Sequence, residues 1–393
     1  MSDRVFYLRF LKPFSVIFFS FFVLHVIGGW HYYLKNSFLL FSTIVFFVVL
    51  YFVTSYSARK FNEFPVDLSL ILKSMSYRKV ILFRILILIG SSWGVLIYYV
   101  GIKSGLTLDE LRVYKSQIFP PAVVLILNGI ALTGYVFLAF SEVARFKVTR
   151  KLQITNIVFL LLGLLGAAAT GTRAVLAPYL WFTGVFLFIF SLFSARKIIF
   201  SAVLALVSMA SVKLFRLIYS DSQGKLDYYI ENGVYQQDNI LLSIWNILRI
   251  HLEDNAWRAY MVFQHVPERM NWQFGKSTFF DFYSLLPGEQ ISPHVYLSWN
   301  VMYGAQEARG YPPTLLAQGW LDYGFLGSLI YAFAYPLIIL FFFRNMVIRR
   351  SQTSIVFYYF ILFNIVLAWY GAINWVFVLL FCLIYKTLSN VKI

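Results

Sequence analysis

The chain has 393 residues, of which 60% are hydrophobic and 20% aromatic, while only 13% are charged. This composition excludes an ordinary soluble globular protein, whose apolar share is about 45–50% and charged share about 25%, and it also excludes a disordered chain. The net charge of +16 would indicate nucleic-acid binding in a soluble protein, but in so apolar a chain it indicates contact with a membrane, and we expect no nucleic-acid partner.

The N-terminal segment carries three basic residues, Arg4, Arg9 and Lys12, ahead of an apolar run from Phe14 to Trp30. This run is long enough to cross a bilayer and lacks an Ala-x-Ala cleavage site. We therefore expect a retained first transmembrane helix rather than a cleaved signal.

Apolar runs of this kind recur along the chain. A helix needs about 20 apolar residues to cross a hydrocarbon core about 30 Å thick. Ten runs meet this need, at 14–34, 37–56, 80–101, 118–141, 152–170, 174–193, 198–217, 323–343, 352–371 and 373–388. The sequence predicts an all-α polytopic membrane protein with about ten transmembrane helices.

Lysine and arginine collect at alternate ends of these runs. They lie at the N-terminus and at 59–79, 145–151, 196–197, 344–350 and 386–392. Because cytoplasmic loops retain positive charge during insertion, we predict that both termini are cytoplasmic. The alternation holds through every run, which supports the count of ten.

The orientation leaves one long polar stretch on the outer side, between helices seven and eight. The chain then divides into transmembrane helices 1–7 (residues 1–217), a large extracytoplasmic loop (218–322) and transmembrane helices 8–10 (323–393). Apolar periodicity over 239–263 predicts one or two amphipathic helices lying at the interface. Several prolines interrupt the remainder of the loop.

Signatures of soluble enzymes are missing from the sequence. There is no phosphate-binding glycine loop, no Gly-x-Ser-x-Gly elbow and no His-Glu-x-x-His pair. The five histidines do not form a ligand set, and the single cysteine, Cys382, permits neither a disulfide within the chain nor a cysteine metal cluster. We expect no metal and no cofactor.

Arginines on the outer side are the first candidates for function. Arg173 follows Gly171 and Thr172 in a very short link between two apolar runs, and a guanidinium at membrane depth is costly and usually functional. A snorkelling arginine is the alternative. Arg112 lies in a polar loop whose acidic residues could neutralise it. Arg84, near a cytoplasmic helix end, is interpreted as structural.

A charged cluster interrupts the amphipathic stretch. It contains Arg249, His251, Glu253, Asp254 and Arg258. The i, i+4 spacing of Asp254 and Arg258 favours a simple ion pair on a solvated face. In the alternative interpretation, a carboxylate or imidazole here deprotonates a sugar hydroxyl while arginines hold an anion.

The segment 309–327 precedes and opens the eighth predicted helix. Its prolines fix the approach of the chain, and its glycines permit close packing. Structurally this is a re-entrant or interfacial turn. Functionally it places Arg309 and Asp322 at the mouth of the bundle.

Several segments together resemble the bacterial O-antigen and oligosaccharide repeat-unit polymerases, the Wzy-type membrane glycosyltransferases. The similar segments are 105–112, 171–173, 274–277, 285–287 and, most strongly, 310–316 with 323–327. One departure is Gln318, where such polymerases often have a glutamate, so an acid-base role at that position is not expected.

The resemblance implies a GT-C-like fold in the bacterial inner membrane with a periplasmic active site. The implied reaction transfers a growing glycan from undecaprenyl pyrophosphate to the next lipid-linked repeat, with a chain-length regulator as a further candidate partner. Arg173 and Arg309, with Arg112 and Arg258 as further candidates, would bind the pyrophosphate and stabilise its charge as it leaves. The candidate bases are Asp254, His251 and Asp322.

Three alternatives stay open at this point. An O-antigen ligase or a SEDS-type glycan polymerase would have a similar arrangement of spans and loop. A lipid-linked oligosaccharide flippase belongs to another class and predicts inverted repeats, of which the sequence has no clear example. A membrane acyltransferase would use a histidine on the cytoplasmic side or inside the membrane, whereas His25 and His31 lie towards the outer end of the first predicted helix.

Overall fold

The computed structural model describes most, but not all, of the chain. The described residues are 29–61, 77–105, 121–169, 173–190, 207, 236, 239–283, 286, 293–297, 300–301, 313–349, 352–367 and 375–390. Every regular element within these ranges is a helix, and none of them contains a strand. Over the described part, the predicted all-α class is therefore confirmed.

The helices differ widely in length. They are α3 (Trp30–Leu34), α4 (Ser37–Phe61), α6 (Tyr77–Lys103), α8 (Pro121–Thr149), α9 (Ile154–Ala169), α10 (Arg173–Ile189), α13 (Ile240–His265), α14 (Phe280–Tyr283), α15 (Pro293–Leu297), α16 (Leu315–Arg349), α17 (Gln352–Leu367) and α18 (Trp375–Asn390). Three segments, Tyr77–Gly101, Val123–Thr149 and Leu315–Arg349, are long and apolar enough to cross a membrane. Shorter apolar helices accompany them in α4, α9, α10 and α17.

Eight of the ten predicted spans coincide with helices, namely α4, α6, α8, α9, α10, α16, α17 and α18. The predicted span at 198–217 and most of the one at 14–34 lie outside the described residues. One or two helices were predicted over 239–263, and the structure has a single helix there, α13. Asn239 caps this helix by accepting a hydrogen bond from the amide of Leu242.

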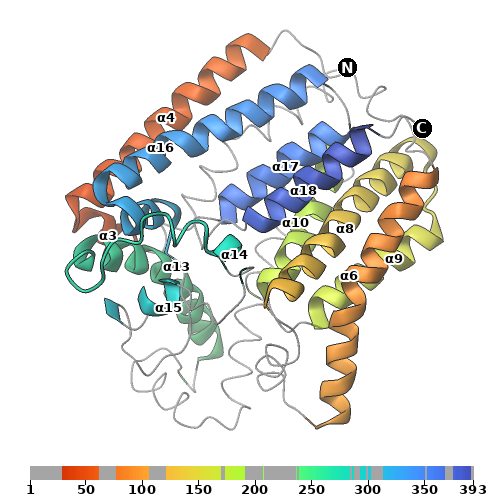
Figure 1. Ribbon diagram of the computed structural model, residues 1–393, viewed down its shortest axis with the longest axis horizontal. Coiled ribbons are helices and arrows are strands. Elements are labelled where there is room, and N and C mark those ends of the chain that lie inside the picture. Colours follow the sequence, from red (N-terminus) through yellow and green to blue (C-terminus); the bar gives the residue numbers. More distant parts are fainter. Residues whose placement is uncertain are drawn as a thin grey trace.

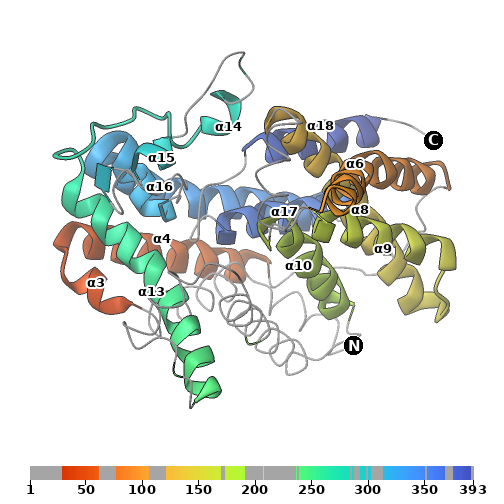
Figure 2. The ribbon, with the colours of Figure 1, turned by 90° about the horizontal axis from the view of Figure 1, so that it is seen from below.

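The helices form two groups joined by α16 (Figure 1). One group contains α6, α8, α9, α10, α17 and α18, and in the other α4 lies beside α16, with α3 and α13 at their first ends. Viewed from below, α13 crosses α4 and α16 steeply (Figure 2). The main core lies between the long helices, and a second core joins α3 and α13 to the first turns of α16.

Close contacts fix the relative directions of α6, α8 and α9. A Cβ on Gly90 would lie 2.5 Å from the carbonyl oxygen of Leu127, and a Cβ on Gly134 would lie 2.7 Å from that of Phe83, so α6 and α8 are antiparallel. Arg84 contacts Asn156 near the start of α9, and a Cβ on Gly94 would lie 2.5 Å from the carbonyl oxygen of Gly166 near its end. Helices α6 and α9 are therefore parallel.

Aromatic contacts give the directions of two further pairs. Tyr135 packs against Tyr179, and five residues later Phe140 packs against Phe186, so α8 and α10 are parallel. Phe38, at the start of α4, contacts Phe325 near the start of the long part of α16. Because α4 and α16 then lie side by side along their length (Figure 1), they are parallel too.

Candidate functional site

Helix α16 is bent sharply near its first end. Tyr323 (φ −142°, ψ 20°) and Gly324 (φ 64°, ψ −147°) leave the helical conformation and separate a short limb, 315–322, from a long limb, 325–349. The limbs touch, because a Cβ on Gly327 would lie only 2.1 Å from the carbonyl oxygen of Gly319. This bend falls at the predicted boundary between the large loop and the eighth predicted span.

A turn from the large loop docks onto the bend. We call residues 273–279 the docked turn. The amides of Gln273 and Phe274 donate hydrogen bonds of 2.9 Å to the carbonyl oxygens of Leu321 and Asp322, respectively. These carbonyls end the short limb and have no continuing helix to bond. The docked turn therefore supplies partners for the last two carbonyls of the interrupted helix.

The carboxylate of Asp322 anchors this docking from inside. Asp322 is fully buried. Its Oδ1 accepts from the amide of Ser277 at 3.1 Å, and its Oδ2 accepts from the amide and the hydroxyl of Thr278 at 3.1 and 2.5 Å. The hydroxyl of Tyr331, on the long limb, lies 3.5 Å from Oδ2. Within the described part of the chain, only neutral donors meet this carboxylate.

Gln318 adds a further link between the short limb and the docked turn. Its Nε2 donates a 3.0 Å hydrogen bond to the carbonyl oxygen of Ser277, and the side chain is 1% exposed. A glutamate at this position would replace that donor with an acceptor. An amide side chain therefore suits this contact better than a carboxylate would.

Aromatic rings are exposed on the docked turn and on the residues beside it. Trp272, Phe274 and Tyr323 are 40%, 70% and 44% exposed. Phe274 has a left-handed backbone, with φ 47°, which costs a residue other than glycine about 1–2 kcal/mol. Gly275 (φ 86°) follows it, and a Cβ there would lie 2.7 Å from the hydroxyl oxygen of Tyr323.

The charged cluster of α13 is organised in local pairs. Arg258 Nη2 lies 2.5 Å from Asp254 Oδ2, and Arg249 Nε lies 3.4 Å from Glu253 Oε1. The pairing that the i, i+4 spacing favours is thus present. Arg258 and Asp254 are both partly buried, with side chains 11% and 24% exposed.

The side chains of the other predicted site residues lie outside the described part of the structure. Arg173 is the first residue of α10 and His251 lies within α13, but the described part of the structure does not extend to either side chain. Arg112 and Arg309 lie outside the described residues. The structure therefore brings together Asp254 with Arg258, and Asp322 with the docked turn.

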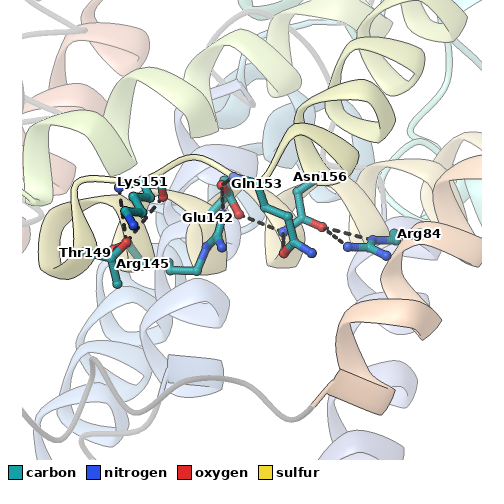
Figure 3. A network of polar contacts seen from close by, with 7 residues as sticks. All are labelled: Arg84, Glu142, Arg145, Thr149, Lys151, Gln153 and Asn156. Atoms are coloured by element: carbon teal, nitrogen blue, oxygen red, sulfur yellow. Dashed lines mark hydrogen bonds and ion pairs between the residues drawn. The ribbon is translucent and has the colours of Figure 1, made fainter.

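A second polar cluster, which the sequence analysis missed, lies where α6, α8 and α9 meet (Figure 3). Glu142, 2% exposed, accepts hydrogen bonds from Arg145, from the amide of Gln153 and from Nδ2 of Asn156, at 2.6, 2.6 and 2.7 Å. Asn156 in turn accepts two from Arg84, at 2.9 and 2.7 Å. These contacts agree with a structural role for Arg84, which meets Asn156 instead of merely extending towards water.

Residues with metal-binding side chains do not gather in the described ranges, where no three His, Cys, Asp or Glu residues could share an ion. No protein-family model, curated protein or solved structure matches the chain. Function must therefore be inferred from the sequence pattern and from the geometry of the bend and the docked turn.

Proposed function

We propose that this protein is a membrane glycosyltransferase that polymerises undecaprenyl-pyrophosphate-linked repeat units at the outer face of the bacterial inner membrane. One observation carries the proposal. Segments 274–277 and 323–327, two of those that resemble the repeat-unit polymerases, meet at one place although more than 40 residues separate them. Asp322 and Tyr323 connect them directly. Such a junction between a large loop and a long apolar helix suits a site at the membrane surface.

We also propose about ten spans in a GT-C-like arrangement, and the helix directions support the alternation of those spans across the membrane. In that topology α6 and α9 run outward, whereas α4, α8, α10 and α16 run inward. The four relative directions, α6 against α8, α6 with α9, α8 with α10 and α4 with α16, all agree with this alternation. They are independent of the lysine and arginine distribution from which the topology was predicted.

Exposed apolar side chains also support a bilayer environment. Phe41, Leu88, Leu161 and Leu337, on four different helices, are each about half exposed. Many similar residues accompany them on α4, α6, α9 and α16. A soluble monomer rarely exposes so much apolar surface, whereas hydrocarbon chains would cover it at no cost.

In the proposed reaction, a hydroxyl oxygen of the acceptor repeat attacks the anomeric carbon of the donor glycan. The bond from that carbon to the diphosphate oxygen breaks, its electron pair stays on undecaprenyl pyrophosphate, and the hydroxyl proton passes to a base. Arg173 and Arg309 would bind the diphosphate, with Arg112 and Arg258 as further candidates.

Among the proposed bases, the two described carboxylates have different surroundings. Asp254 is partly exposed and already pairs with Arg258. Asp322 is enclosed by donors, which favours a role in positioning the docked turn over proton transfer. His251 completes the set of candidates, and a base must come within hydrogen-bond reach of the acceptor hydroxyl.

The test is polymerisation by the purified protein in lipid nanodiscs supplied with lipid-linked repeat units. We expect a ladder of glycan lengths, whereas a ligase gives no ladder and a flippase gives no covalent product. Arg173→Ala should abolish the ladder while inserting normally. Arg344→Ala is the matched control, because Arg344 is exposed near the end of α16 that the proposed topology places on the cytoplasmic side. Equal activity of the Arg173 variant and the wild type would remove Arg173 from the mechanism.

A further inference from the structure

Phe274 combines two features that rarely occur together. Its backbone is left-handed, with φ 47°, and its ring is 70% exposed. A strained conformation persists only where the surroundings impose it, and such strain is concentrated at ligand-binding and catalytic positions. Burial does not explain why a phenylalanine occupies this position, where glycine or asparagine would adopt the same backbone more easily.

Three exposed rings, those of Trp272, Phe274 and Tyr323, lie at the start of the docked turn and at the bend of α16, and we call them the ring platform. The ring centroids of Phe274 and Tyr323 are 6.3 Å apart, and the rings are nearly perpendicular. Trp272 packs on Gly324, where a Cβ would lie 3.1 Å from the indole ring. Each ring keeps at least 40% of its surface exposed.

The backbone that carries the ring platform is rigid. Asp322, the residue before Tyr323, accepts the hydrogen bonds of Ser277 and Thr278 and so fixes the docked turn to α16. The rings are thus set in position before any ligand arrives, which lowers the entropic cost of binding.

A lysine lies on the docked turn two residues after Phe274. Lys276 is exposed and forms no ion pair with any residue in the described ranges. Its amide is bound to the carbonyl oxygen of Gln273 at 2.9 Å, so its backbone is fixed. The docked turn therefore carries the exposed ring of Phe274 together with one ammonium group.

We propose that the ring platform and Lys276 bind the sugar-phosphate portion of the lipid-linked substrate, an inference that rests on the proposed function. The apolar C–H face of a pyranose ring would lie on Phe274, flanked by Trp272 and Tyr323, and Lys276 would contact a phosphate oxygen as a mobile point charge. A membrane-interface belt of aromatic residues is the competing explanation, but a belt requires no left-handed backbone.

The first experiment measures binding of N-acetylglucosamine 1-phosphate, glucose 1-phosphate and galactose 1-phosphate to the full chain in nanodiscs, by saturation-transfer difference NMR. Phe274→Asn removes the ring while an asparagine tolerates the left-handed backbone, so the fold is retained. We expect at least about tenfold weaker binding, equal to about 1.4 kcal/mol. Phe274→Tyr should retain wild-type binding.

Matched controls separate a specific platform from general effects. Tyr283→Asn removes a comparably exposed ring outside the platform, at 38% exposure, and should leave binding unchanged. Lys276→Gln should weaken binding of the sugar phosphates but not of the free sugars, whereas Lys103→Gln should affect neither. Failure of every probe to bind the wild type, or equal binding by Phe274→Asn, overturns the proposal.

A second measurement tests the membrane alternative. Nanodiscs of phosphatidylethanolamine and phosphatidylglycerol containing brominated acyl chains quench tryptophans that lie within the bilayer, and the contribution of Trp272 is the difference from Trp272→Phe. We expect Trp272 to escape this quenching, and strong quenching would assign the rings to the membrane instead. The length ladder is measured separately from probe binding. A wild-type protein that polymerises but binds no probe would therefore refute the ring-platform proposal and leave the proposed function standing.

Discussion

Asp322 provides the most direct test of how the docked turn is held. Replacing it with alanine leaves the buried amides of Ser277 and Thr278 without their acceptor. A hydrogen bond to a charged group contributes about 1.5–3 kcal/mol, and an unsatisfied buried donor costs about 1–3 kcal/mol. Because part of this loss is recovered when the turn detaches and its amides meet water, we expect the docking free energy to fall by about 3 kcal/mol.

Hydrogen–deuterium exchange of the peptide covering 273–283 measures this loss. A change of about 3 kcal/mol corresponds to about a hundredfold lower protection, if exchange follows local opening of the turn. Glu253→Gln is the control, because its exposed pair with Arg249 should contribute under about 1 kcal/mol. Unchanged protection of Ser277 and Thr278 in Asp322→Ala would refute the anchoring role.

Three further substitutions test other parts of the structure by thermal unfolding in detergent. Gln318→Glu should destabilise the protein by about 3 kcal/mol, because a buried carboxylate would face the carbonyl oxygen of Ser277; a melting temperature equal to that of the wild type would contradict this. Glu142→Gln should cost about 2–3 kcal/mol by leaving donors of the α8–α9 cluster unpaired, and a stable variant would show that this cluster is dispensable. Burial lowers the pKa of His294 from 6.5 to about 4, so its neutral form favours folding above pH 6.5 and this stability, about 3 kcal/mol, is lost as the pH falls towards 4. His294→Gln should flatten that part of the stability profile, and an unchanged profile would be the contrary result.

The positions of most helices were predictable, because long apolar runs leave few alternatives to a helix. Eight predicted spans coincide with helices, and Asn239, a favourable N-cap residue, lies directly before α13. The bend was harder to locate. Segment 315–322 is apolar enough to continue the following helix. The helix is interrupted at Tyr323 and Gly324, and of these two only glycine, which here has a positive φ, is a residue that commonly breaks a helix.

The contacts that build the candidate site could not be predicted from spacing. Asp322 and Thr278 are 44 residues apart, and nothing local in either segment specifies the partner. From the sequence, Asp322 was expected at the mouth of the bundle. In the structure it is fully buried, which its hydrogen bonds permit. Glu142 and Asn156 were overlooked for the same reason. Glu142 directly follows one apolar run and Asn156 lies within the next, and the two satisfy one another across helices.

The central claim is that each new glycosidic bond releases one lipid diphosphate. The ratio of bonds formed to diphosphate released tests this claim most directly. Purified protein in nanodiscs is incubated with lipid-linked repeats, and both the glycosidic bonds formed and the undecaprenyl pyrophosphate released are counted. We predict one molecule of undecaprenyl pyrophosphate for each new bond, with products of increasing length. Undecaprenyl pyrophosphate that stays attached to every saccharide, with no product longer than one repeat, would contradict the proposed function.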